Sequence, residues 1–276
     1  MRSMDEQTLI NERERLLSNV VDFFGLDSAV VGVFLGGSIP AGEADAYSDI
    51  DLRVVVIAEE HARFIESRLE MPKQWSNFLY NEWLEGTQHC VTHVKPFGKI
   101  DIFYLSLANY QPSPWYKLPT RVLYDPKGVI AEVVEKSRDL VFQITEEEVD
   151  RSLSKGLASA QEVYRRICRG ELFFAQSLLD SIRQHMIQAD DWINNRPPQA
   201  VTFSKLEKRA SESIIQAFRQ SYVGLDRRQI EKAFSELFRV YRQQIIELHN
   251  QFLLRRSLEN DLYAVDLILK EGHEDA

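Results

Sequence analysis

The sequence has little cysteine, no long apolar run and no excess of positive charge. Cys90 and Cys168 are its two cysteines among 276 residues, too few for the disulfide framework of a small secreted domain. The longest apolar run, near Ala29–Leu35, is much shorter than the roughly 20 residues that a membrane-spanning helix needs. Met1–Arg15 is too highly charged for a signal peptide. We therefore expect a cytoplasmic protein without a membrane segment.

Basic residues are the minority among the charged side chains. The chain has 33 Lys and Arg against 42 Asp and Glu, a net charge of −9. Because proteins that bind nucleic acid present a basic surface to the phosphates, we expect no nucleic-acid partner. The acids are unevenly distributed: residues 1–128 hold 18 acids and 12 bases, and the remainder holds 24 and 21. If the acids of the first part converge, they would hold metal ions or attract a cationic small molecule.

Hydrophobic periodicity divides the chain into an α+β first part and an all-α second part. After a helical segment at Asp5–Phe24, apolar runs and period-two alternation predict strands at 29–35, 49–57, 88–94, 100–107 and 121–124. Four prolines within Gln111–Gly128 indicate irregular chain at the end of this part. Amphipathic stretches then predict helices at 146–168, 172–189, 206–222, 228–254 and 258–270. We therefore predict two domains, 1–128 and 129–276.

The most informative segment joins the first two predicted strands. Gly36-Gly37-Ser38 ends the first strand, and Asp49 and Asp51 lie on one face of the second, since side chains at i and i+2 of a strand point the same way. Two carboxylates so close repel each other unless a cation lies between them, and Mg²⁺ prefers such oxygen ligands. The glycine backbone N–H groups and the Ser38 hydroxyl can bind a phosphate. The segment predicts a phosphate cradle that faces a metal site.

A third acid, Asp101, lies on a later predicted strand, where its apolar neighbours point to the opposite face. It would meet Asp49 and Asp51 if the two strands are adjacent in one sheet. Three converging carboxylates can hold two metal ions, which stabilise the attacking and leaving oxygens of a displacement at phosphorus. The alternative is that Asp101 forms a simple surface ion pair with Lys99.

These residues resemble a known family. Gly37-Ser38, the Asp49 and Asp51 pair within Ser48–Leu52, and Asp101 on a later strand are similar to the motifs of the nucleotidyltransferase superfamily typified by DNA polymerase beta, and more narrowly of the aminoglycoside and lincosamide nucleotidyltransferases. The resemblance implies a nucleotidyltransferase domain at 1–128, with a small mixed β-sheet flanked by helices. It also implies that 129–276 is a helical-bundle domain that forms the other wall of the cleft.

The resemblance also implies an activity. The enzyme would use two Mg²⁺ ions to move a nucleoside monophosphate, AMP from ATP, onto a hydroxyl of a small molecule such as an aminoglycoside-like antibiotic, with release of pyrophosphate. Asp49, Asp51 and Asp101 would be the catalytic residues and the metal ligands, and Gly37 with Ser38 would bind the nucleotide. Relatives of this kind occur as monomers and homodimers, and the same is expected here.

Three alternatives stay open at this point. The general base is Asp101 or, as a second choice, Glu171 of the helical domain. Many relatives have an arginine where this chain has Ala41, so Arg53 or a base of the helical domain would meet the triphosphate charge. The rival functions are a nucleotidyltransferase that modifies a protein or RNA, as antitoxin-like enzymes do, and a catalytically silent nucleotide-binding module. The long helical half disfavours the first rival and the three acids disfavour the second.

Overall fold

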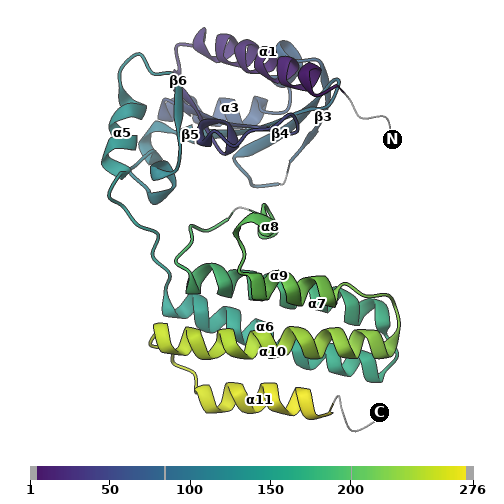
Figure 1. Ribbon diagram of the computed structural model, residues 1–276. Coiled ribbons are helices and arrows are strands. Elements are labelled where there is room, and N and C mark those ends of the chain that lie inside the picture. Colours follow the sequence, from purple (N-terminus) through teal and green to yellow (C-terminus); the bar gives the residue numbers. More distant parts are fainter. Residues whose placement is uncertain (1–4, 84, 200, 272–276) are drawn as a thin grey trace. The chain divides into compact units, whose positions relative to one another are not determined.

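The computed structural model describes residues 5–83, 85–199 and 201–271 of the chain. Contacts divide the protein into two compact units, Met1–Val141 and Phe142–Ala276. The first unit carries the sheet and the second is helical (Figure 1). The predicted order, an α+β part followed by an all-α part, is therefore confirmed. Residues 1–4 and 272–276 of the two predicted domains lie outside the described residues.

The first unit is built on a mixed six-stranded sheet, counted over the described residues, with the order β3-β4-β5-β2-β1-β6. Strands β2 and β5 run parallel, and the other neighbouring pairs are antiparallel. The strands are β1 (Val30–Gly36), β2 (Ile50–Val56), β3 (Phe78–Glu82), β4 (His89–Val94), β5 (Gly98–Ser106) and β6 (Arg121–Tyr124). All five predicted strands are present. Strand β3 is an additional edge strand.

Helix α1 (Glu6–Gly25) covers one face of this sheet together with α3 (His61–Ser67) and α4 (Pro72–Trp75). The buried alternate residues of β2, Ile50 and Leu52, share a cluster with Ile100 and Ile102 of β5 and with the apolar stripe of α1. Because strand side chains alternate, the intervening residues of β2 and β5 point to the opposite face. The shorter helices of this unit are α2 (Ser38–Ala41), η1 (Ala58–Glu60), η2 (Leu107–Asn109) and η3 (Pro114–Lys117).

Helix α5 (Val129–Ser137) packs on that opposite face and belongs to the first unit. Its Ile130 and Val133 form a buried cluster with Phe34 of β1 and Val55 of β2. The structural division at 141/142 is therefore later than the expected boundary at 128/129. The prolines before Gly128 signal irregular chain, but the chain returns once more to the sheet before it leaves the unit.

The second unit has its own buried cluster, which is built between Val149 and Ile268. Its helices are α6 (Glu146–Cys168), α7 (Leu172–Ile193), α8 (Leu206–Arg209), α9 (Glu212–Ser221), α10 (Arg227–Gln251) and α11 (Leu258–Glu271). The single helix predicted at 206–222 is wrong, because Ala210 is extended and the Ser211 N–H donates to the Asp190 carboxylate at 3.0 Å. Among the described helices, none is long and apolar enough to cross a membrane.

The close packing of α5 on the sheet gives a stability prediction. A Cβ added at Gly32 of β1 would lie 2.4 Å from Ile130 Cδ1 and 2.9 Å from the backbone oxygen of Tyr124. Gly32→Ala is therefore expected to lower the free energy of unfolding by about 1–3 kcal/mol, as overpacked cores do. Thermal unfolding followed by circular dichroism measures this. Gly25→Ala is the control, since a Cβ there meets nothing within 4 Å; equal melting temperatures for the two variants would contradict the prediction.

Candidate active site

The parallel pairing of β2 with β5 brings the predicted acids together. Asp51 is the register partner of Asp101, and neighbouring strands lie about 4.8 Å apart. Asp49 comes directly before β2, two residues from Asp51, and points to the same face. The structure therefore assembles all three acids on the sheet face opposite to α1. Their apolar neighbours, Ile50 and Ile100, are fully buried on the other side.

Lys99 of β5 lies among these acids. Its Nζ donates a hydrogen bond to Asp49 Oδ2 at 2.7 Å and to Asp101 Oδ2 at 3.2 Å, and it is 3.1 Å from Asp101 Oδ1. Burial opposes the positive charge of this half-buried side chain, but its hydrogen bonds to the two aspartates raise its pKa above the ordinary value. The ion pair of Lys99 with Asp101 is thus present, but it is not the simple surface pair of the alternative interpretation, because it is partly buried and Lys99 also binds Asp49.

Burial makes two of the carboxylates hard to ionise. The pKa of Asp51 is raised by desolvation and further by the charge of Asp49, and the charge of Arg53 opposes the shift. Desolvation also raises the pKa of Asp101, and Lys99 opposes it. A carboxylate held in this state gains from any additional cation that approaches it. The site is therefore prepared to bind positive charge.

The glycine turn after β1 touches the same acids. Gly36 is the register partner of Asp51, and Gly37 has φ 71° and ψ −148°, a conformation that residues with a Cβ rarely adopt. A Cβ at Gly37 would lie 1.9 Å from Asp51 Oδ2. The backbone of the predicted nucleotide-binding residues Gly37 and Ser38 is therefore held against the carboxylates, where only glycine allows so close an approach.

Arg53 fills the space above Gly36. A Cβ at Gly36 would lie 2.5 Å from Arg53 Nη1, and this nitrogen donates to the backbone oxygen of Asp51 at 3.0 Å. The guanidinium carbon is 5.2 Å from the centre of the Phe103 ring. Burial lowers the pKa of Arg53, although Asp51 opposes that change. A charged group thus lies next to the glycine turn. This is the position that Arg53 needs if it, and not a base of the helical domain, meets the charge of the triphosphate.

Helix α1 holds the loop that leads to Asp49. Arg13 donates to the backbone oxygens of Asp45 and Ser48, and the Ser48 hydroxyl donates to Asp45 Oδ1 at 2.9 Å. The loop is therefore closed on itself and fastened to the helix. Arg13 carries no motif that the sequence could have revealed, because its partners are backbone atoms 32 and 35 residues away.

The donor set fits magnesium, although the site is not a complete metal cage. Over the described residues, no three His, Cys, Asp or Glu side chains are grouped so that they could hold a metal ion. Asp101 Oδ1 is nevertheless buried and has no hydrogen bond, only the ion-pair contact with Lys99 at 3.1 Å, and Gly37 leaves Asp51 Oδ2 the room that a Cβ would take. Magnesium commonly uses one or two carboxylates together with substrate phosphates. These residues suit a metal that arrives with a nucleotide.

Among the pockets formed by the described residues of the first unit, one borders Asp49, whereas a larger one does not. The pocket of about 230 Å³ is lined by Asp49 and Lys99 and by the aromatic side chains of Tyr47, Tyr80 and Phe97, among others. The aromatic side chains therefore lie beside one of the three carboxylates, and Leu9, Arg13 and Leu16 of α1 also line this pocket.

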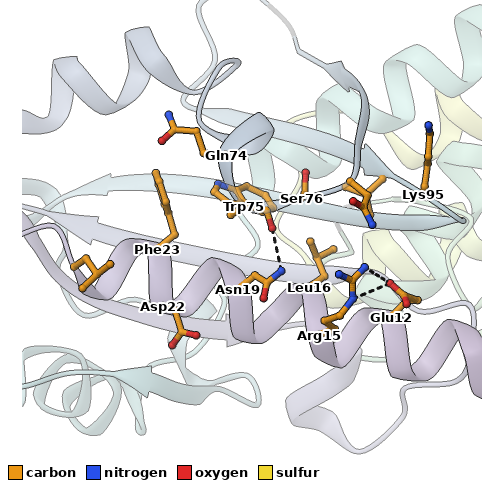
Figure 2. A pocket seen from close by; sticks show the side chains of 13 residues that line it. Glu12, Arg15, Leu16, Asn19, Asp22, Phe23, Gln74, Trp75, Ser76 and Lys95 are labelled. Carbon is orange, nitrogen blue, oxygen red and sulfur yellow. Dashed lines mark hydrogen bonds and ion pairs between the residues drawn. The ribbon is translucent and has the colours of Figure 1, made fainter.

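The larger pocket, of about 470 Å³, lies on the α1 side of the sheet, between α1 and the segment around α4. Figure 2 shows Asn19 reaching across it to the backbone oxygen of Trp75, to which it donates at 3.2 Å. None of the predicted site residues lines it. This pocket is therefore not assigned to the candidate active site, although it is the larger of the two.

Known proteins are similar to this chain over most of its length. A family model described as streptomycin adenylyltransferase matches residues 10–263, a range that includes parts of both units. No curated protein is significantly similar. An aminoglycoside 6-adenyltransferase from Bacillus subtilis is 12% identical with a TM-score of 0.44, over 96% of this chain and 99% of that chain. A nucleotidyltransferase-like protein from Exiguobacterium sibiricum 255-15 is 11% identical with a TM-score of 0.43, over 94% and 91%.

The close approach of Gly37 to Asp51 gives a binding prediction. Gly37→Ala forces a Cβ into the carboxylate and the backbone out of its turn, so we expect the affinity for ATP with magnesium to fall at least about tenfold. Isothermal titration calorimetry measures the affinity. Gly42→Ala is the matched control: Gly42 also has a positive φ of 72°, but a Cβ there meets nothing within 4 Å. An equal loss in both variants would show that strain alone, and not the carboxylate contact, is responsible.

The raised pKa of Asp51 gives a stability prediction. Because this pKa is higher in the folded protein than its ordinary value of 3.8, ionisation of Asp51 destabilises the fold above the raised pKa, and the penalty vanishes below the ordinary value. Asp51→Asn is therefore expected to raise the melting temperature by about 2–4 °C in metal-free buffer at pH 7, an effect of about 1 kcal/mol. The gain should shrink towards pH 4. Asp49→Asn, which removes a partner of Lys99, should give no such gain; a lower melting temperature for Asp51→Asn would refute the argument.

Proposed function

The chain belongs to the streptomycin adenylyltransferase family, as an adenylyltransferase of the nucleotidyltransferase superfamily, and we propose that it uses magnesium to transfer AMP from ATP to a hydroxyl of an aminoglycoside-like antibiotic. Pyrophosphate is the second product. A resistance function in the cytoplasm, where ATP is available, follows from this proposal. The protein acts as a monomer or a homodimer and needs no nucleic acid.

One observation supports the proposal most directly. Asp51 and Asp101 are register partners on adjacent parallel strands, and the turn at Gly37 lies against Asp51. A structural sheet gains nothing from two facing carboxylates with raised pKa values. An enzyme that must bind cations and a triphosphate at one point needs such an arrangement.

The residues divide the work as follows. Asp49, Asp51 and Asp101 would hold magnesium, which supplies charge stabilisation for the attacking and leaving oxygens. Gly37 and Ser38 bind the triphosphate through backbone N–H groups and a hydroxyl, and Arg53 contributes a fixed positive charge beside the same turn. The acceptor oxygen attacks the α-phosphorus, the bond to the β-phosphate oxygen breaks, and pyrophosphate leaves with that electron pair.

The proton of the acceptor hydroxyl passes to a general base, for which we propose Asp101. Its raised pKa makes it a better proton acceptor than an ordinary aspartate. Glu171, the second choice, belongs to the helical unit and is paired with Arg166 at 2.5 Å.

The charge of the protein supports a cationic acceptor. Residues 1–128 contain 18 acids and 12 bases, and the whole chain has a net charge of −9. An acidic surface attracts polycations such as aminoglycosides and raises their encounter rate. The same charge disfavours RNA as the acceptor.

The proposal is tested by incubating the enzyme with α-³²P-labelled ATP, magnesium and a panel of aminoglycosides, and by following transfer of label on thin-layer plates. We expect transfer to at least one antibiotic, with pyrophosphate released in equal amount. Asp49→Asn, Asp51→Asn and Asp101→Asn should each lower the rate on the order of a hundredfold or more. Asp139→Asn, which changes an exposed acid of the same unit, should leave it unchanged. Transfer that survives all three site substitutions would refute the mechanism.

A further inference from the structure

Lys99 places an ammonium group between two of the three acids. Its Nζ is 2.7 Å from Asp49 Oδ2 and 3.1 Å from Asp101 Oδ1. The side chain of Lys99 is 36% exposed and that of Asp101 is 20% exposed. This is unlike the surface pair Lys136–Glu132, in which both side chains are at least 60% exposed. The contact of Lys99 is therefore part of the site and not a solvated ion pair.

The acids require such a partner before any metal binds. Two carboxylates on facing strands repel each other, and burial adds to the cost of their charge. Arg53, the other base at this place, directs its Nη1 to the backbone oxygen of Asp51. Lys99 alternates with Ile100 along β5, so it points to the same face as Asp101. Its ammonium thus meets Asp49 and Asp101 without leaving the strand.

We propose that Lys99 is a positioning residue that serves as the built-in counter-ion of the acids, holds Asp49 and Asp101 together, and keeps divalent cations out until a nucleotide brings them. This inference rests on the proposed function. Lys99 takes the place at which a cation would bridge the two carboxylates, and no three acids of the described residues are grouped so that they alone could hold a metal ion. A divalent ion must therefore displace the ammonium, and nucleotide phosphates supply the additional oxygen ligands that make the exchange favourable.

The test is the binding of Mn²⁺, a spectroscopic substitute for magnesium, to the full-length protein without nucleotide. Electron paramagnetic resonance of free Mn²⁺ gives the dissociation constant for the wild type, Lys99→Met and Lys99→Arg. Removing a neighbouring positive charge should tighten binding at least about tenfold in Lys99→Met. Lys99→Arg keeps the charge and should bind as weakly as the wild type. Without metal, Lys99→Met should melt several degrees lower than the wild type. Saturating Mn²⁺ should abolish this difference in melting temperature.

Lys136→Met is the matched control, because it removes a lysine from a 2.6 Å pair with Glu132 on the surface of the same unit, and it should change neither measurement. Equal or weaker Mn²⁺ binding by Lys99→Met, or absence of binding by both proteins, overturns the inference. The proposed function is tested by separate measurements. Wild-type transfer of AMP together with unchanged Mn²⁺ binding by Lys99→Met defeats only the inference, whereas Mn²⁺ binding that persists in Asp51→Asn and Asp101→Asn defeats the proposed metal site.

Discussion

The register of the parallel pair β2–β5 is the constraint on which the candidate active site depends. Side chains along a strand alternate, so a slip of one residue would bury Asp101 and expose Ile100. The core prevents this, because Ile50 and Leu52 of β2 and Ile100 of β5 are fully buried on the α1 side. The free energy of this apolar packing therefore holds Asp51 and Asp101 opposite each other, although their carboxylates repel each other.

Much of the fold could be predicted because it follows local apolar patterns. The alternation through Ile50 and Leu52 marks β2, and Pro96 with Gly98 marks the turn between β4 and β5. Strand β3 was not predicted, because it is an edge strand without a buried apolar face. Its Leu79 and Tyr80 are 43% and 55% exposed. The break between α8 and α9 was not predicted either, since the Ser211 N–H donates to Asp190, which is distant in the sequence.

The candidate site could be predicted in its parts but not in its assembly. Asp49 and Asp51 share a face by strand geometry alone, and the glycines beside them suggest a phosphate. Their meeting with Asp101 depends on which strands are neighbours, and no local pattern determines that. The same holds for Lys99: its pairing with Asp101 is visible from the spacing, whereas its bond to Asp49 exists only because β2 lies beside β5.

The buried clusters of the described residues do not mix the two units. Residues between Leu16 and Val133 build the clusters of the first unit, and residues between Val149 and Ile268 build that of the second. Replacements in separate cores contribute nearly additively to the free energy of unfolding. A substitution within the buried cluster of the helical unit therefore leaves the side chains of the clusters that support the acid-bearing strands unchanged.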